Sequence, residues 1–237
     1  MTEKPAVKAF LFDLTGTLYD IDSDLEAHRQ VAHWLIARYD LDVTPASLHQ
    51  TANRLIATYV KRLTKGQYLS GRELMESLWR RLCTVFKLPS SGLNEFIDKT
   101  REFHRRFAQE VPGATNTLQE LKAAGFSLGL VSQIDSELMD VIVDELGFRD
   151  YMDVVASAEE VGKARPDPAV ISYAVEKMGV KAEETVMVGD DIVSDIEPAR
   201  KLGLTTILLA PQGTVGAVKA DHRIDTLEQV LTFAKER

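Results

Sequence analysis

The second half of the chain alternates between strand-like and helix-like segments, and this alternation constrains the fold more than any other feature. Short β-prone apolar runs lie at 126–131, 153–156, 185–188 and 205–209. They alternate with helical patterns at 112–124, 135–146, 167–178 and 192–202, each followed by glycine, and a last helical pattern spans 226–235. Glycine is common where a helix ends in the left-handed conformation. Strands joined by helices form right-handed crossovers, so we predict an α/β fold with a parallel sheet.

The N-terminal segment belongs with this alternating half, although a long stretch separates the two. Residues 7–12 form an apolar run without clean alternation, which is typical of a strand buried on both faces of a parallel sheet. Residues 19–109 show only helical patterns, including the capping box Ser70-Gly71-Arg72-Glu73. We therefore predict a core of residues 1–18 and 110–237 and an inserted all-helical cap of residues 19–109. Such a cap can cover the strand ends and exclude water.

Charge and composition exclude several classes of protein. The net charge of −8 at pH 7 argues against a nucleic-acid-binding surface. No apolar run reaches the length of a membrane-spanning helix, and residues 1–8 lack the apolar centre of a signal peptide. The single cysteine, Cys83, fits a reducing compartment. We expect a cytoplasmic protein that binds neither nucleic acid nor membrane; the sequence does not predict its oligomeric state.

Polar residues stand where the predicted strands end, and open α/β sheets place their chemistry at these ends. In chain order the polar segments are Asp13-Leu14-Thr15-Gly16-Thr17, Ser132-Gln133, Lys163-Ala164-Arg165-Pro166-Asp167, and Gly189-Asp190-Asp191 with Asp195 one helical turn further on. Mg²⁺ prefers oxygen ligands, so the carboxylates among them are candidate metal ligands. Four such segments in succession indicate one shared active site rather than four isolated turns.

These segments resemble, in order, the four motifs of the haloacid dehalogenase superfamily, and the resemblance covers nearly the whole chain. It implies a Rossmann-like core with a helical cap, a nucleophile at Asp13, and Ser132 as a ligand of the transferring phosphoryl group. It also implies Mg²⁺ bound by Asp13, by the backbone carbonyl of Thr15 and by acids of the fourth motif. The candidates among those acids are Asp190, Asp191 and Asp195. Asp191 and Asp195 compete for the outer role, and one of them could be only a charge near a helix N-terminus.

Two positions depart from the family pattern. The family has lysine directly before Pro-Asp-Pro, where this chain has Arg165; Lys163 lies two residues earlier, and we favour it slightly as the cation that faces Asp13. The family's phosphatases have a second acid two residues after the nucleophile, where this chain has Thr15. That acid protonates the leaving group and later activates water, and such help is typically worth ~10²- to 10⁴-fold. Cation-pumping ATPases of the superfamily resemble this chain in having threonine there.

The sequence thus predicts a Mg²⁺-dependent phosphatase that acts on a small phosphorylated metabolite through an aspartyl-phosphate intermediate. The threonine implies a slow enzyme, a substrate with a good leaving group, or an acid from the cap. One alternative is a 2-haloacid dehalogenase, although that branch usually has tyrosine in place of Thr15 and asparagine in place of Gln133, and lacks the acid-rich fourth motif. The other alternative is a weakly active or non-catalytic phosphate-binding protein. We expect surface or packing roles for the histidines, which show no metal-ligand spacing: His28, His33, His49, His104 and His222.

Overall fold

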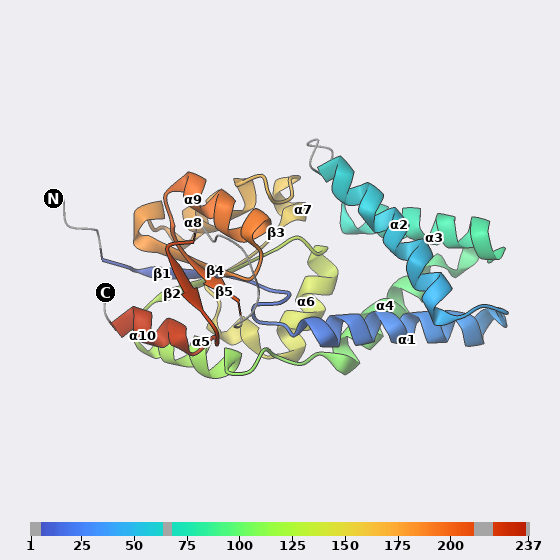
Figure 1. The fold of residues 1–237 in the computed structure, drawn as a ribbon, viewed down its shortest axis with the longest axis horizontal. Coiled ribbons are helices and arrows are strands. Elements are labelled where there is room, and N and C mark those ends of the chain that lie inside the picture. The colour runs from blue at the N-terminus through green and yellow to red at the C-terminus, as the bar shows by residue number, and fades with distance from the viewer. Residues whose placement is uncertain (1–5, 64–67, 211–219, 236–237) are drawn as a thin grey trace.

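A parallel sheet with flanking helices forms one end of the molecule, and a group of longer helices forms the other (Figure 1). The computed structural model describes residues 6–63, 68–210 and 220–235. Its strands are β1 (Ala9–Asp13), β2 (Ser127–Ser132), β3 (Val154–Ser157), β4 (Thr185–Gly189), β5 (Thr205–Leu209) and β6 (His222–Ile224). Their order is β3-β2-β1-β4-β5-β6, and each pair of neighbours is parallel. The predicted Rossmann-like α/β fold is confirmed, and β6 is a strand that the sequence analysis did not predict.

Helices cover both faces of the sheet. They are α5 (Ala114–Ala123), α6 (Ser136–Glu145), α7 (Ala158–Val161), α8 (Ala169–Met178), α9 (Glu197–Leu202) and α10 (Gln229–Lys235), with short helices at Phe148–Tyr151 and Ala182–Glu184. Phe10 and Phe12 pack in one apolar cluster with side chains of α5, α6 and α10, while Leu11 packs in another with side chains of α8 and α9. Every residue of β1 is buried, which explains why its sequence lacks polar alternation.

The helix predicted over 192–202 is divided into two pieces. Residues Ile192–Ile196 form a π-helical turn, and α9 begins only at Glu197. Pro198 lies in the first turn of α9. Backbone N–H groups there have no partner within the helix, so the N–H that proline lacks is not needed. The division matters for the site, because Asp195 lies in the π-helical turn that follows β4.

Four further helices lie between β1 and α5: α1 (Ile21–Tyr39), α2 (Pro45–Leu63), α3 (Gly71–Phe86) and α4 (Leu93–Phe107), with a short helix at Ser90–Gly92. They share a hydrophobic core of their own, in which the rings of Trp79 and Phe96 stack with centroids 5.2 Å apart. The predicted capping box at the start of α3 is present: Ser70 Oγ accepts from the Glu73 backbone N–H at 3.3 Å, and Glu73 accepts from the Ser70 N–H at 2.8 Å. The domain limits predicted at residues 19 and 109 stay a prediction.

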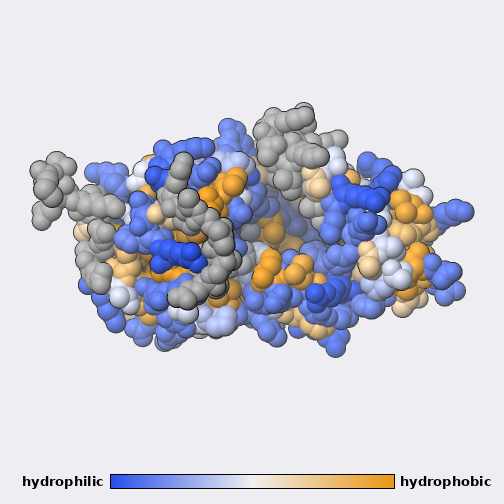
Figure 2. Space-filling model, in the orientation of Figure 1, coloured by the Kyte–Doolittle hydropathy of each residue, from blue (hydrophilic) through white to orange (hydrophobic). Residues whose placement is uncertain are grey.

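The two connections between the sheet and these four helices run side by side. The Asp20 N–H donates to the Gln109 carbonyl at 2.9 Å, and the Val111 N–H donates to the Leu18 carbonyl at 2.8 Å. These bonds hold the start of α1 and the end of α4 beside the carboxyl end of β1. Figure 2 shows a mostly hydrophilic face, with a smaller group of hydrophobic side chains between the sheet and the helical part. Within the described ranges, none of the helices is both long and apolar enough to cross a bilayer.

Candidate active site

The carboxyl ends of β1, β2 and β4 meet near the middle of the sheet, where the strand order reverses. In the register Asp13 pairs with Val131 of β2, and Phe12 pairs with Val188 of β4. Asp13 therefore lies next to Ser132 and close to the Gly189-Asp190 segment. In open α/β sheets a crevice forms outside the strand ends at such a reversal, and ligands bind in it.

A cavity of about 500 Å³ lies at these strand ends, between the sheet and the helices of the cap region. The sheet side contributes Asp13, Thr15, Ser132, Gln133, Arg165, Asp190, Asp191 and Asp195, and the helical side contributes Asp24, His28, Leu74, Met75, Leu78 and Thr100. Every predicted site residue except Lys163 thus lines one cavity. Its wall is charged on the sheet side, where carboxylates outnumber the one guanidinium, and it is largely apolar along α3.

Arg165 is the cation that the structure places against Asp13. Its Nη2 donates to Asp13 Oδ1 at 2.5 Å, and its Nη1 donates to Asp195. The guanidinium side chain is only 5% exposed, so its charge acts in a medium of low dielectric. The planar fork of arginine allows it to bind two carboxylates at once, which a single ammonium group cannot do with the same geometry.

Lys163, which the sequence analysis slightly favoured for this position, points elsewhere. Its side chain is 59% exposed, and its Nζ lies 3.4 Å from Asp167 Oδ2 in a surface ion pair. The side chain leaves the loop before α8 toward solvent, whereas Arg165 leaves it toward the strand ends. The structure therefore assigns the inward position to Arg165, the residue directly before Pro166, as the family pattern has for its lysine.

Three carboxylates gather at the strand ends. Oxygens of Asp13, Asp190 and Asp195 all lie within 4.8 Å of one another. Burial raises the pKa of all three carboxyls; for Asp190 it does so to about 6, with the neighbouring charge of Asp13 adding to the effect. One guanidinium cannot balance three carboxylates, so a divalent cation that prefers oxygen ligands fits this set. Mg²⁺ meets that description and retains waters at its remaining positions.

Asp191 and Asp195 have different roles in the structure. Asp191 is the N-cap of the Ile192–Ile196 turn, and its Oδ1 accepts from the Ser194 N–H at 2.6 Å. Asp195 is 1% exposed, and its Oδ2 accepts from the Asp191 N–H at 3.0 Å. Asp191 therefore serves the helix terminus, one of the two roles left open for it, while Asp195 faces Asp13.

The turn after β1 brings a backbone segment against Asp190. The N–H groups of Leu18 and Tyr19 donate to the Leu14 carbonyl at 2.9 and 2.8 Å, which closes a tight turn around Thr15 and Gly16. Gly16 has φ of +90°, and a Cβ there would collide with the Asp190 carboxylate. Only glycine allows both this conformation and this approach. The glycine in the motif was thus a sequence signal for the short distance between the turn and the fourth motif.

Thr15 and Ser132 supply neutral groups to the cavity. Ser132 is buried, and its Oγ accepts from the Ile134 N–H at 3.3 Å, which leaves the hydroxyl proton for another acceptor. Thr15 is half-buried and lines the same wall. A hydroxyl cannot act as an acid at neutral pH, so Thr15 cannot replace the acid that the family's phosphatases have at this position.

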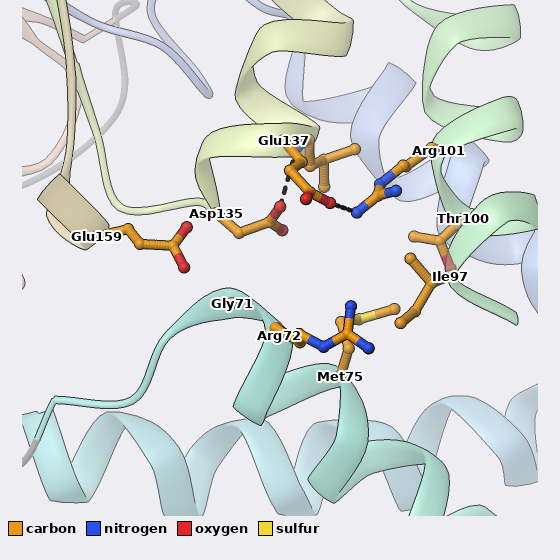
Figure 3. Close-up of a pocket in the computed structure, with 10 residues that line it drawn as sticks. Gly71, Arg72, Met75, Ile97, Thr100, Arg101, Asp135, Glu137 and Glu159 are labelled. Atoms are coloured by element: carbon orange, nitrogen blue, oxygen red, sulfur yellow. Dashed lines mark hydrogen bonds and ion pairs between the residues drawn. The ribbon is translucent and has the colours of Figure 1, made fainter. Parts of the chain in front are cut away.

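The helical part is fastened to the sheet part beside the cavity. Arg101 of α4 forms an ion pair with Glu137 of α6, and Gly71 at the start of α3 lies so close to Asp135 that a Cβ would overlap it (Figure 3). A smaller pocket of about 130 Å³ lies between these elements. The contacts hold α3 and α4 over the strand ends.

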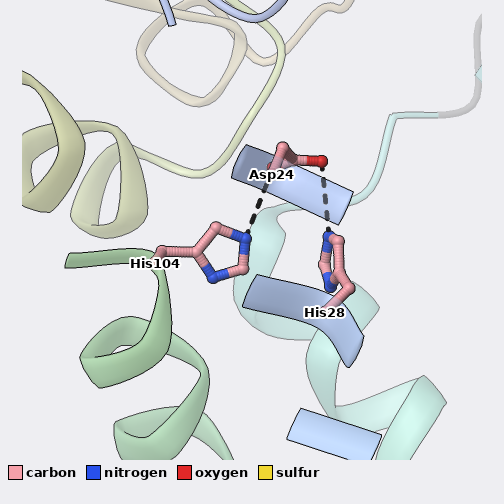
Figure 4. Close-up of side chains that lie close together, drawn as sticks. All are labelled: Asp24, His28 and His104. Atoms are coloured by element: carbon pink, nitrogen blue, oxygen red, sulfur yellow. Dashed lines mark ion pairs between the residues drawn. The ribbon is translucent and has the colours of Figure 1, made fainter. Parts of the chain in front are cut away.

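Three polar side chains on the helical side were not predicted as site residues. Asp24 and His28 lie one turn apart on α1, and His104 lies near the end of α4; the two rings flank the Asp24 carboxylate (Figure 4). Their spacing in the sequence predicts surface or packing roles for these histidines. The spacing of Asp24 and His28 was a weak local signal, but nothing in the sequence paired them with His104, which is 80 residues away from Asp24.

Comparison with known proteins shows the family to which this chain belongs. The family model described as haloacid dehalogenase-like hydrolase matches residues 7–203. The chain belongs to the haloacid dehalogenase-like hydrolases. The resemblance drawn from the four motifs is thereby confirmed, and the protein is a hydrolase.

Curated relatives and solved structures of this family extend over almost the entire chain. A ribulose-1,5-bisphosphate 5-phosphatase of Halopiger xanaduensis is 32% identical, with 94% of this chain and 97% of the relative covered. A glyceraldehyde 3-phosphate phosphatase of Methanocaldococcus jannaschii is 26% identical, with 97% of each covered. The crystal structure of a 2-haloacid dehalogenase from Pseudomonas syringae matches with a TM-score of 0.75 and 25% identity, over 98% of this chain and all of that one. The fold is thus shared by phosphatases and dehalogenases, and the side chains at the strand ends must distinguish them.

Proposed function

We propose that this haloacid dehalogenase-like hydrolase is a Mg²⁺-dependent phosphatase of small phosphorylated metabolites. The observation that carries the proposal is the arrangement around Asp13: a buried guanidinium on one side and two further carboxylates, of Asp190 and Asp195, within 4.8 Å. A dianionic phosphate would be repelled by Asp13 alone. A cation beside the nucleophile and acids that can bind a divalent metal together remove that repulsion.

In the proposed reaction the Asp13 carboxylate attacks phosphorus, the Asp13 O–P bond forms and the bond from phosphorus to the leaving oxygen breaks. The leaving oxygen takes a proton from solvent or from the cavity wall. Water then attacks the phosphorus of the aspartyl-phosphate, which releases inorganic phosphate and restores Asp13. Arg165 holds Asp13 in position, and the Ser132 hydroxyl donates to a phosphoryl oxygen. Mg²⁺ bound by Asp13, Asp190, Asp195 and the Thr15 carbonyl would neutralise charge on the phosphoryl group.

Thr15 predicts which substrates react well. Without the family's second acid, the leaving oxygen departs with less help, so esters with good leaving groups react faster than alkyl esters. General acid catalysis is typically worth ~10²- to 10⁴-fold, and this is the range of the deficit that we expect for alkyl phosphates.

The substrate class follows from the cavity and the relatives. Residues of α3 and α4 line the cavity opposite the strand ends, and its volume of about 500 Å³ suits a small molecule better than a protein surface. Relatives named for ribulose-1,5-bisphosphate and glyceraldehyde 3-phosphate act on small phosphorylated sugars. We propose a substrate of this kind, with residues 19–109 as a cap that excludes water, and a cytoplasmic enzyme.

The 2-haloacid dehalogenase is the competing function, since it uses the same type of nucleophile and shares the fold. Dehalogenases of this family attack carbon without a metal and lack the acid-rich fourth motif. Here Asp190 and Asp195 lie beside Asp13, where they would repel a haloacid carboxylate without a cation between them. This arrangement favours phosphoryl transfer.

The test measures hydrolysis of p-nitrophenyl phosphate and acetyl phosphate by the full-length protein, with Mg²⁺ and with EDTA. We expect Mg²⁺-dependent turnover that Asp13→Asn abolishes, whereas Lys163→Met, a change at an exposed residue, leaves it close to the wild-type rate. No turnover of either ester at any Mg²⁺ concentration would refute the proposed phosphatase activity. Chloride release from L-2-chloropropionate without Mg²⁺, measured in parallel, would show that the protein is a dehalogenase instead.

A further inference from the structure

Asp24, His28 and His104 form a compact cluster away from the sheet acids. His28 Nε2 lies 3.7 Å from Asp24 Oδ2, and His104 Nε2 lies 3.3 Å from Asp24 Oδ1. One ligand atom of each residue falls within 4.8 Å of the others. Because α1 and α4 pack against each other, the two rings approach the carboxylate from two different helices (Figure 4).

The hydrogen bonding of His104 leaves a buried lone pair that faces this cluster. Its Nδ1 lies 2.8 Å from the Thr100 carbonyl, which can only accept, so Nδ1 carries the proton. In a neutral ring Nε2 is then an acceptor. It is fully buried, and no described residue donates a hydrogen bond to it. It lies 3.3 Å from Asp24 Oδ1, which is also an acceptor, and two facing lone pairs repel unless a cation lies between them.

A carbonyl that orients the ring through Nδ1 is also the usual outer-shell arrangement of a metal-binding histidine. It fixes the tautomer and directs Nε2 toward the metal. His28 adds a second imidazole nitrogen, and Asp24 adds a carboxylate whose oxygens face the two rings at 3.7 and 3.3 Å.

The distances suit a transition metal. Zn²⁺ binds imidazole nitrogen and carboxylate oxygen at about 2.0–2.2 Å in tetrahedral geometry, so neighbouring ligand atoms are roughly 3.3–3.5 Å apart. The separations of 3.3 and 3.7 Å require only small side-chain movements. Two nitrogens and one oxygen favour zinc over Mg²⁺, which prefers oxygen ligands alone.

We propose that Asp24, His28 and His104 bind Zn²⁺ at a second metal site in the helical cap, distinct from the carboxylates around Asp13. Asp24 and His28 also line the large cavity, so the fourth coordination position faces it and takes a water or an oxygen of a bound molecule. The site goes beyond the proposed phosphatase function and does not depend on it. The competing state is a proton in place of the metal, with His104 as an imidazolium paired to Asp24.

The experiment titrates Zn²⁺ into the metal-stripped, full-length protein by calorimetry in the presence of saturating Mg²⁺, which occupies the oxygen-only site. Co²⁺ absorption in the visible region reports tetrahedral coordination independently. We expect one equivalent of Zn²⁺ to bind the wild type. The same binding is expected in Asp190→Asn, which alters the sheet acids, and in His33→Gln, which changes an exposed histidine on the same helix.

The variants His28→Gln and Asp24→Asn should weaken Zn²⁺ binding by more than the ~10- to 100-fold that loss of an outer-shell partner costs. Both side chains are partly exposed, so thermal unfolding of the metal-free variants should match the wild type and show that they fold. Absence of Zn²⁺ binding to the wild type would overturn the site and leave the protonated cluster. Binding that survives both substitutions, or that Asp190→Asn abolishes, would overturn it as well.

Discussion

Removal of the Arg165 guanidinium is the perturbation that tests the site most directly. Arg165→Met preserves much of the length and packing of the side chain but leaves Asp13 and Asp195 without their shared cation. All three side chains are at most 5% exposed, so water cannot replace the lost charge. Truncating one partner of a buried pair typically costs about 3–5 kcal/mol, because an uncompensated charge stays buried.

This free energy corresponds to a large change in thermal stability. For a chain of 150–250 residues, 1 kcal/mol shifts the unfolding midpoint by roughly 2–4 °C, so we expect Arg165→Met to lower it by roughly 6–20 °C. The unfolding midpoint of Arg165→Lys should lie between those of Arg165→Met and the wild type, since one ammonium group cannot bind both carboxylates in the fork geometry of arginine.

The loss of stability in Arg165→Met should grow as the pH rises. Burial already raises the pKa of both carboxyls, and removing Arg165 raises it further. The native variant then binds more protons than the unfolded chain, so its stability falls as pH rises. The destabilisation relative to wild type should therefore be greater at pH 8 than at pH 5.

Thermal and urea unfolding of the metal-free proteins at both pH values measures these effects, with Lys163→Met as the matched control. Lys163 is exposed, and among the described residues its ion-pair partner is Asp167, so its loss should cost under about 1 kcal/mol. If Lys163→Met destabilises as much as Arg165→Met, or if Arg165→Met unfolds like the wild type, Arg165 is not the buried partner of Asp13.

Three further predictions concern the same site. Thr15→Asp should speed hydrolysis of alkyl phosphates by ~10²- to 10⁴-fold but change p-nitrophenyl phosphate hydrolysis little; an unchanged or lower alkyl rate would mean that the acid comes from elsewhere. Gly16→Ala should cost about 1–2 kcal/mol of unfolding free energy for its positive φ and also weaken Mg²⁺ activation, because a Cβ collides with Asp190; an unaltered Mg²⁺ titration would contradict the close approach. Burial raises the pKa of Asp190 to about 6, so protons compete with the cation there. The apparent Mg²⁺ affinity should therefore fall by up to ~10-fold per pH unit below pH 6. A Mg²⁺ activation constant that does not change from pH 5 to 8 would argue against Asp190 as a ligand.

Much of the fold was predictable because it rests on local patterns. The buried strand before Asp13, the capping box at Ser70 and the glycines after successive helices are signals that a few adjacent residues create through backbone conformation and burial. Strand β6 escaped prediction because it has only three residues and one buried side chain, too few for a periodic signal. The division of the helix at Pro198 could have been read from the proline itself.

The residues at the ends of the strands could be named from the sequence alone, because the place where each apolar run stops is a local property of the chain. That was enough to identify the family and to place Asp13, Ser132 and Asp190 in one site. The sequence did not show that Arg165 rather than Lys163 faces Asp13, or that Asp195 faces Asp13 while Asp191 caps a turn; packing settles both. The physical reason is that residues two or four positions apart share one local pattern, and their side chains diverge only when the loop or helix turn packs. The cluster of Asp24, His28 and His104 was beyond the sequence for a related reason: it exists only because α1 and α4 pack together across 80 residues of chain.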